Sequence, residues 1–278
     1  MVNIIDLVAL AMLGVALAEP AETQVENHVE VSGQDVTDNY TCVHPPYNVH
    51  LFSQSPLIVY IENFITPDER AHLLAETYGD PDPSHLAAGQ GNFTSSSVVD
   101  SRGQIVDSKV RTSKSAELER DAIVSCIEER AREFQGFDLP VANIETFQLV
   151  KYEKKQMYLH HTDWFMDEVT LTSLGGNRVS SFFGVVKAHN VTGGGTNFPA
   201  LEAPRDERWC RFIDCDQPYK SGVTFRPIEG NLVYWRNLLE SGEGDWRTLH
   251  AGLPVVTGEK VGINIWTRQA SVPLSWRL

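Results

Sequence analysis

The chain has 278 residues, a formal net charge of −14 and 42% hydrophobic residues. This length and composition are typical of a folded protein with a sizeable core, and they exclude a largely disordered chain. Acidic residues outnumber basic ones by 37 to 23, which disfavours binding to the phosphates of nucleic acids.

The beginning of the chain predicts export. Residues 7–18 form an apolar block that ends in small residues, so we expect residues 1–18 to be a secretory signal. An uncleaved N-terminal anchor or a buried helix is the alternative, because Asp6 stands where a positive charge is expected. No other membrane-spanning helix is expected.

Asn-x-Ser/Thr sequons favour the same compartment. Three of them occur, at Asn39, Asn92 and Asn190, and each is an acceptor for N-glycosylation in exported proteins. We therefore expect the protein in the lumen of the endoplasmic reticulum or outside the cell.

The remainder of the chain divides by composition into three parts. Residues 19–55 are polar without a sustained period and predict a loose N-terminal arm. Residues 56–270 form the expected folded domain, and residues 271–278 are a short C-terminal tail.

The first half of the domain predicts two helices. A β-rich run at residues 56–61 precedes a helix that starts at Thr66, with a capping box, and ends at Gly79. Residues 80–108 are rich in Gly, Ser, Asp and Pro and predict a long loop, while residues 116–134 have the period of a helix.

Short β-rich runs dominate the second half. They are separated by Gly and Asn clusters and lie at residues 144–152, 179–187, 231–236 and 261–268. Helices followed by many strands predict a mainly β fold of the α+β class, with helices packed outside the β core.

Four cysteines are consistent with an oxidising compartment, and they allow three complete pairings. Cys210 and Cys215 are close enough in sequence to close a local loop. Cys126 lies between apolar residues of the second expected helix, which favours a buried free thiol, and Cys42 lies in the arm.

A candidate metal motif follows the first strand of the β-rich half. His161 and Asp163 are two residues apart at an expected strand end, so their side chains point to the same face, and His160 points to the other. With a distant second histidine they form a 2-His-1-carboxylate site, which leaves positions open for a co-substrate and oxygen. Alone, His-x-Asp is more often a surface pair.

His250 and Lys260 supply the missing half of this pattern. A histidine on one strand and a lysine on the next suit a dicarboxylate co-substrate, whose one end chelates iron while the other pairs with the ammonium.

Four blocks in order resemble the catalytic domain of the prolyl 4-hydroxylase type, a family of iron(II)- and 2-oxoglutarate-dependent dioxygenases. The first is the Arg-Thr-Ser of residues 111–113, and the second runs from Tyr152 to Asp163. The third comprises residues 175–178 and 193–199, and the fourth begins at residue 230 and includes His250 and Lys260.

This resemblance implies a double-stranded β-helix, or jelly roll, with Fe(II) bound by His161, Asp163 and His250. It implies 2-oxoglutarate and O2 as co-substrates, ascorbate as a reductant, and Lys260 and Tyr152 as contacts of 2-oxoglutarate. The residues expected to line the substrate groove are Tyr158, Arg178 and Trp266.

Three residues depart from the family pattern. Lys155 stands where glycine is usual, Asn197 where an apolar residue is common, and Leu253 where related extracellular members have a cysteine. The disulfides of those members therefore cannot be transferred to this chain.

The resemblance implies hydroxylation of prolyl residues in secretory-pathway polypeptides, with release of succinate and CO2. One alternative is an oxygenase that tailors a peptide or a small natural product. The other is a non-catalytic binding domain with the same fold, which the complete set of His161, Asp163, His250 and Lys260 disfavours.

Overall fold

The computed structural model describes residues 40–78, 93–96, 98–99, 105–106, 111–136 and 138–273. The expected signal, the sequons at Asn39 and Asn92, most of the loop at 80–108 and residues 274–278 lie outside the described residues.

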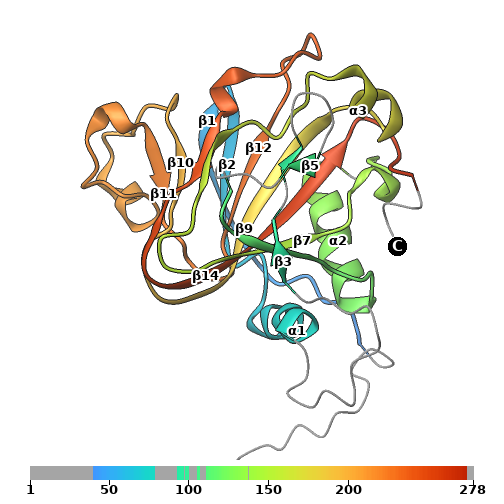
Figure 1. Cartoon of the computed structure of the whole chain (residues 1–278), viewed down its shortest axis with the longest axis horizontal. Helices are drawn as coiled ribbons and strands as arrows, with labels where there is room; N and C mark the ends of the chain where they lie inside the picture. Colours follow the sequence, from blue (N-terminus) through green and yellow to red (C-terminus); the bar gives the residue numbers. More distant parts are fainter. Residues whose placement is uncertain are drawn as a thin grey trace, which may run out of the picture. The chain divides into compact units, whose positions relative to one another are not determined.

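Two antiparallel sheets form the frame of the described part of the chain (Figure 1). The large sheet has the strand order β1-β2-β12-β9-β14-β7-β6-β3, and the small sheet has the order β11-β10-β13-β8. The large sheet contains β1 (Asn48–Gln54), β2 (Leu57–Glu62), β3 (Thr94–Ser95), β6 (Lys114–Glu117), β7 (Gln148–Tyr152), β9 (Arg178–Gly193), β12 (Leu232–Arg236) and β14 (Val255–Arg268). The small sheet contains β8 (Tyr158–His161), β10 (Thr196–Phe198), β11 (Val223–Phe225) and β13 (His250–Gly252). A separate ribbon pairs β4 (Val98–Val99) with β5 (Ile105–Val106).

The predicted double-stranded β-helix is confirmed. From β7 to β14 successive strands alternate between the large and the small sheet, apart from β10 and β11, which both lie in the small sheet. The apolar side chains of β2, β9, β12 and β14 pack against the faces of the large sheet. One buried cluster lies between the large sheet and the helices, and another packs β2 and β12 against β10 and β11.

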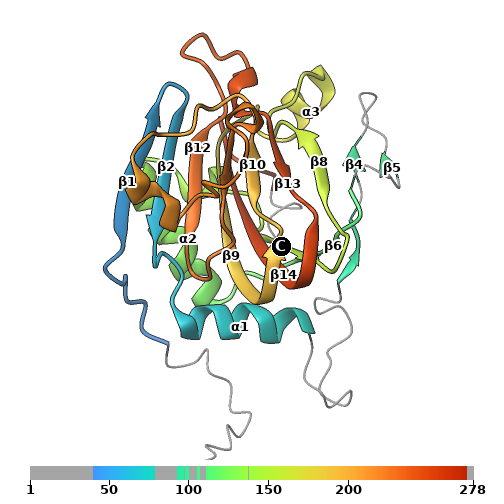
Figure 2. The ribbon, with the colours of Figure 1, turned by 90° about the vertical axis from the view of Figure 1, so that its left-hand side faces the viewer.

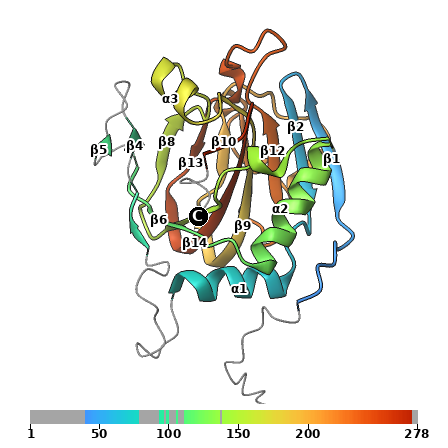
Figure 3. The same cartoon turned by 90° about the vertical axis from the view of Figure 1, so that its right-hand side faces the viewer.

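Two helices, α1 (Pro67–Tyr78) and α2 (Ala122–Gln135), pack against the face of the large sheet that points away from the small sheet (Figures 2 and 3). Helix α1 (Pro67–Tyr78) starts with the predicted capping box, in which Glu69 Oε2 accepts from the Thr66 amide and Thr66 Oγ1 accepts from the Glu69 amide. The part of the chain that the structure describes also contains α3 (Glu168–Ser173) and the short 3-10 turns η2 (Val141–Asn143), η3 (Glu207–Arg211), η4 (Tyr219–Ser221) and η5 (Trp246–Thr248).

The predicted start of the second helix at residue 116 is wrong. Asp121 is the N-cap of α2, and its carboxylate accepts from the Val124 amide. Residues 114–117 instead form β6, because Ala116 pairs with Leu149 across the sheet. The apolar residues before the cap fit a helical period, but pairing with β7 determines their conformation.

The polar arm contains more structure than its composition indicated. Strand β1 falls inside the predicted arm at 19–55 and pairs antiparallel with β2 along its length. Its alternation of exposed and half-buried residues covers seven positions only, which is short for a period to be recognised among polar neighbours.

All four cysteines are paired. Cys210 and Cys215 close the local loop that their spacing allowed. The prediction of a free thiol at Cys126 is wrong, because Cys126 is bonded to Cys42 and attaches the segment before β1 to α2. The partners are 84 residues apart, so no local pattern indicates this bond.

Candidate active site

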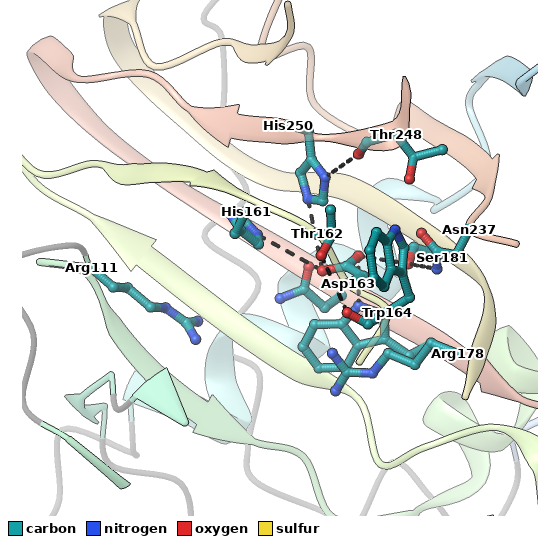
Figure 4. A network of polar contacts seen from close by, with 12 residues as sticks. Arg111, His161, Thr162, Asp163, Trp164, Arg178, Ser181, Asn237, Thr248 and His250 are labelled. Carbon is teal, nitrogen blue, oxygen red and sulfur yellow. Dashed lines mark hydrogen bonds and ion pairs between the residues drawn. The ribbon is translucent and has the colours of Figure 1, made fainter. Parts of the chain in front are cut away.

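The three predicted metal ligands meet between the sheets (Figure 4). His161 ends β8, Asp163 follows two residues later, and His250 begins β13. His161 and His250 are direct cross-strand partners, which places both imidazoles on the same face of the small sheet. One ligand atom from each residue lies within 4.8 Å of the others.

Both imidazoles present Nε2 to the same carboxylate oxygen. His161 Nδ1 lies 2.8 Å from the Leu159 carbonyl, and His250 Nδ1 lies 2.9 Å from the Thr248 carbonyl. A carbonyl only accepts, so each Nδ1 carries the proton and each Nε2 keeps its lone pair. Each Nε2 lies 3.8 Å from Asp163 Oδ1.

The other oxygen of Asp163 is fully engaged. Its Oδ2 accepts from Ser181 Oγ at 2.6 Å and from Trp266 Nε1 at 3.0 Å. The carboxylate therefore points Oδ1 toward the two imidazole nitrogens. Two neutral imidazoles and one carboxylate on a single side are the donor set that iron(II) takes in 2-His-1-carboxylate oxygenases, so these residues fit iron.

The charges of these ligands suit a divalent cation. The pKa of His161 is lowered to about 3, mainly by burial and also by the neighbouring His250. Burial acts to raise the pKa of Asp163, but the two imidazoles and Arg178 outweigh it and lower that pKa to about 2. At neutral pH, His161 is neutral and Asp163 is ionised, as metal binding requires.

Lys260 lies on β14 opposite Tyr152 of β7. It is 1% exposed, and its ammonium donates to the Gly194 carbonyl and lies 4.8 Å from the centre of the Tyr152 ring and 5.2 Å from that of Phe183. Burial lowers the pKa of Lys260 to about 7. Burial also raises the pKa of Tyr152 to about 12, so its hydroxyl stays a donor.

A cavity of about 760 Å³ opens beside the ligands. Tyr152 and Phe183 line it, and the Lys260 ammonium lies over these two rings. The three predicted substrate residues, Tyr158, Arg178 and Trp266, line the cavity as well. The predicted site residues therefore line one cavity, except for Lys260, which contacts two of the residues that line it.

The three predicted substrate residues are each held by a neighbour. Tyr158 stacks on His161 with ring centres 3.5 Å apart. The Arg178 guanidinium lies 3.6 Å from the centre of the Trp266 ring and binds both oxygens of Glu145, at 2.7 and 2.8 Å. Trp266 in turn donates to Asp163, so it connects the cavity wall to the metal ligands.

For several residues of the site, the sequence predicted no role. Arg111 lies in the Arg-Thr-Ser block, lines the cavity and lies 4.8 Å from the centre of the Tyr158 ring. That block was the available signal for Arg111. Glu145, Ser181 and Thr248 contact site residues from other strands and loops, so no local motif identifies them.

Two of the three departures from the family pattern, Lys155 and Asn197, have structural explanations. Lys155 has φ of 70°, the left-handed conformation that glycine adopts without strain. His160 points away from His161, and its Nε2 lies 3.2 Å from Asn197 Oδ1. The unexpected histidine and the unexpected asparagine are thus partners.

Comparison with known proteins agrees with this geometry. Residues 147–268 match the 2OG-Fe(II) oxygenase superfamily. Prolyl 4-hydroxylase 1 of Arabidopsis thaliana is 31% identical over 222 residues, which is 78% of this chain and 70% of that protein. Prolyl 4-hydroxylase 2 of the same plant is 32% identical over 226 residues, 80% of this chain and 70% of that protein.

This chain belongs to the prolyl 4-hydroxylase family. It is a 2-oxoglutarate- and iron(II)-dependent dioxygenase, with O2 as the oxidant. The viral collagen prolyl hydroxylase of Paramecium Bursaria Chlorella virus-1, solved with 2-oxoglutarate, shares the fold at a TM-score of 0.50 and 20% identity, over 83% of this chain and 97% of that one.

Proposed function

We propose that this prolyl hydroxylase acts on peptidyl proline in polypeptides of the secretory pathway and releases succinate and CO2. The observation that carries the peptide assignment is the cavity wall of Tyr158, Arg178 and Trp266 directly beside the metal ligands. A cavity of about 760 Å³ has room for a peptide segment in addition to the co-substrate.

Each group of side chains has a separate task in this reaction. His161, Asp163 and His250 hold the iron, and Lys260 with the Tyr152 hydroxyl binds the far carboxylate of 2-oxoglutarate. Iron and 2-oxoglutarate supply the oxidation: one oxygen atom of O2 enters succinate as CO2 leaves, and the other enters the substrate as hydroxyl. We include ascorbate as the reductant that restores ferrous iron.

The cavity wall orients the substrate. Glu145 fixes the Arg178 guanidinium at two points, and this guanidinium covers the indole of Trp266. Tyr158 lines the same cavity, with its ring stacked on His161 and the Arg111 guanidinium 4.8 Å from the ring centre. These contacts position the target carbon and shield the reaction from water.

A panel of synthetic peptides tests the activity. We expect mass spectrometry to show one added oxygen on proline in a subset of proline-rich peptides, with succinate formed in equal amount and no product from His161→Ala. Oxygen transfer to non-peptide compounds, with every proline peptide inert, would instead support the natural-product alternative.

The secretory location is proposed on two features of the chain. Both cysteine pairs are bonded, as is common in oxidising compartments. The sequon at Asn190 lies on β9, at an irregularity in the pairing of this strand with β14, and its asparagine is exposed, as a glycan acceptor must be. Within the described residues, no helix has the length and apolarity needed to cross a bilayer.

Expression of the full chain in a eukaryotic secretory host tests this location. We expect Asn190→Gln to remove one glycan, seen as a mobility step that glycosidase treatment abolishes. Protein that stays in the cytosol and carries no glycan would contradict the proposed compartment without affecting the proposed activity.

A further inference from the structure

We propose that Asn237 is a positioning residue for the iron ligand Asp163, acting through Ser181. Asn237 directly follows β12, and both Asn237 and Ser181 are fully buried. Asn237 Nδ2 donates to Ser181 Oγ at 2.9 Å, and Ser181 Oγ donates to Asp163 Oδ2 at 2.6 Å (Figure 4). This inference rests on the iron site of the proposed function.

Trp235 fixes the direction of the hydrogen bonds that lead from Asn237 through Ser181 to Asp163. Trp235 Nε1 lies 2.8 Å from Asn237 Oδ1, and an indole nitrogen can only donate. Asn237 must therefore present its carbonyl oxygen to Trp235 and its amide nitrogen to Ser181. The contact with Trp235 thus determines which way the Asn237 amide is turned.

The Asn237 amide then determines the orientation of the Ser181 hydroxyl. A serine hydroxyl has a single hydrogen and rotates freely unless its neighbours restrict it. Because Asn237 donates to Ser181 Oγ, the hydroxyl hydrogen is directed at Asp163 Oδ2. Consecutive hydrogen bonds that all run from donor to acceptor in one direction polarise one another. This strengthens the bond from Ser181 to the Asp163 carboxylate.

These hydrogen bonds determine which oxygen of the Asp163 carboxylate faces the metal site. Ser181 and Trp266 occupy Oδ2, so Oδ1 is the oxygen that faces the two Nε2 atoms. Loss of the Asn237 amide frees the Ser181 hydroxyl to rotate and frees Asp163 to turn. We therefore expect Asn237 to increase affinity for iron, although it touches neither the ion nor any of its ligands.

The main chain of Asn237 also supports the second half of the site. Its carbonyl accepts from the Asp245 amide at 2.8 Å, and the Asp245 carbonyl accepts from Thr248 Oγ1 at 2.7 Å. Thr248 is the residue whose carbonyl fixes His250. Side-chain substitutions at Asn237 leave these main-chain bonds available, so they test the branch to Asp163.

The inference is tested by anaerobic titration of iron(II) into the purified full chain, with calorimetry as the measurement of affinity. We expect Asn237→Leu to weaken iron binding about tenfold and Ser181→Ala by a similar or larger factor. In the Ser181→Ala background, Asn237→Leu should add little, since it acts through that hydroxyl. Asn237→Asp keeps the acceptor for Trp235 but lacks the donor to Ser181, so it should also weaken iron binding. It serves as the second variant if Asn237→Leu does not fold.

Asn231 provides a matched control for a purely structural effect. It lies at the other end of β12, is also buried, and also makes two side-chain hydrogen bonds, to the Asn63 amide and to the Tyr60 hydroxyl. We expect Asn231→Leu to lower the melting temperature of the iron-free protein as much as Asn237→Leu while leaving iron affinity unchanged.

Three outcomes separate the possibilities. Unchanged iron affinity in Asn237→Leu or Asn237→Asp overturns the inference. The inference also fails if Asn237→Leu weakens iron binding by the same factor in the Ser181→Ala background as in the unmodified protein. Absence of iron binding by the unmodified protein would instead refute the iron site itself.

Discussion

At the scale of single residues, the second heteroatom of each iron ligand is occupied. Main-chain carbonyls hold Nδ1 of His161 and His250, and Ser181 with Trp266 holds Oδ2 of Asp163. The three remaining atoms face one another, and these hydrogen bonds hold each ligand in that orientation.

Lys260 gives the site a pH dependence with a definite sign. Burial lowers its pKa to about 7, so the free enzyme loses the ammonium as the pH rises through that value. A carboxylate binds the ammonium form, and above about pH 7 a proton must be taken up first. We therefore expect the Kd for 2-oxoglutarate, measured anaerobically with iron, to rise up to tenfold per pH unit above about pH 7.

Lys260→Met is the control, because methionine keeps most of the apolar volume and removes the charge. The Kd of this variant for 2-oxoglutarate should be higher than that of the unmodified enzyme at every pH. It should also lack the change between about pH 6 and pH 9 that the titration of Lys260 causes. A Kd of the unmodified enzyme that is constant over that range would contradict the assignment of Lys260.

At the scale of elements, the strand that carries His161 is an edge strand. Strand β8 pairs with β13 on one side, while Tyr158 forms an isolated bridge to Arg111 on the other. Asn197 on β10 reaches His160 across the intervening β13. Its amide nitrogen shares its two hydrogens among the Ser221 and Val223 carbonyls and Thr224 Oγ1. One buried amide thus joins β8 to the segment that leads into β11.

We expect Asn197→Leu to lower the free energy of unfolding by about 2 kcal/mol, since buried acceptors lose their donor. Hydrogen exchange should accelerate in residues 212–225, and chemical denaturation gives the free energy. His160→Ala, at the exposed end of the same contact, should cost less than Asn197→Leu. A stability gain from Asn197→Leu, the apolar residue type common in the family, would contradict this role.

The elements and the ligands differ in how far the sequence predicts them. His161, Asp163, His250 and Lys260 follow from spacing and from the order of four family blocks, because each lies in a local pattern. The start of α2 and the existence of β1 were not predicted, since pairing with β7 and β2 outweighs local preference there. Contacts such as Cys42 with Cys126 and His160 with Asn197 join distant segments, and one sequence carries no local sign of them.

At the scale of the whole molecule, the two disulfides differ in the length of chain that they close. Cys42 and Cys126 are 84 residues apart, whereas Cys210 and Cys215 are five apart. The chain-entropy relation gives about 4–5 kcal/mol of stabilisation for the longer loop and about 2 kcal/mol for the shorter. Paired Cys→Ser variants, compared by denaturant unfolding, should therefore differ by about 2 kcal/mol.

The Cys210→Ser/Cys215→Ser pair is the control for loss of a bond as such. Equal losses in the two double variants, or a larger loss from the short loop, would show that the segment before β1 contributes less to the fold than its bond to α2 indicates.

We expect iron and 2-oxoglutarate to bind together where His161, Asp163 and His250 meet. Anaerobic addition of iron(II) and 2-oxoglutarate to the purified chain, monitored by visible absorption, tests it directly. We predict a metal-to-ligand charge-transfer band in the unmodified protein and none in folded His250→Ala. Folded, unmodified protein without the band, or a band of equal strength in His250→Ala, would contradict the claim.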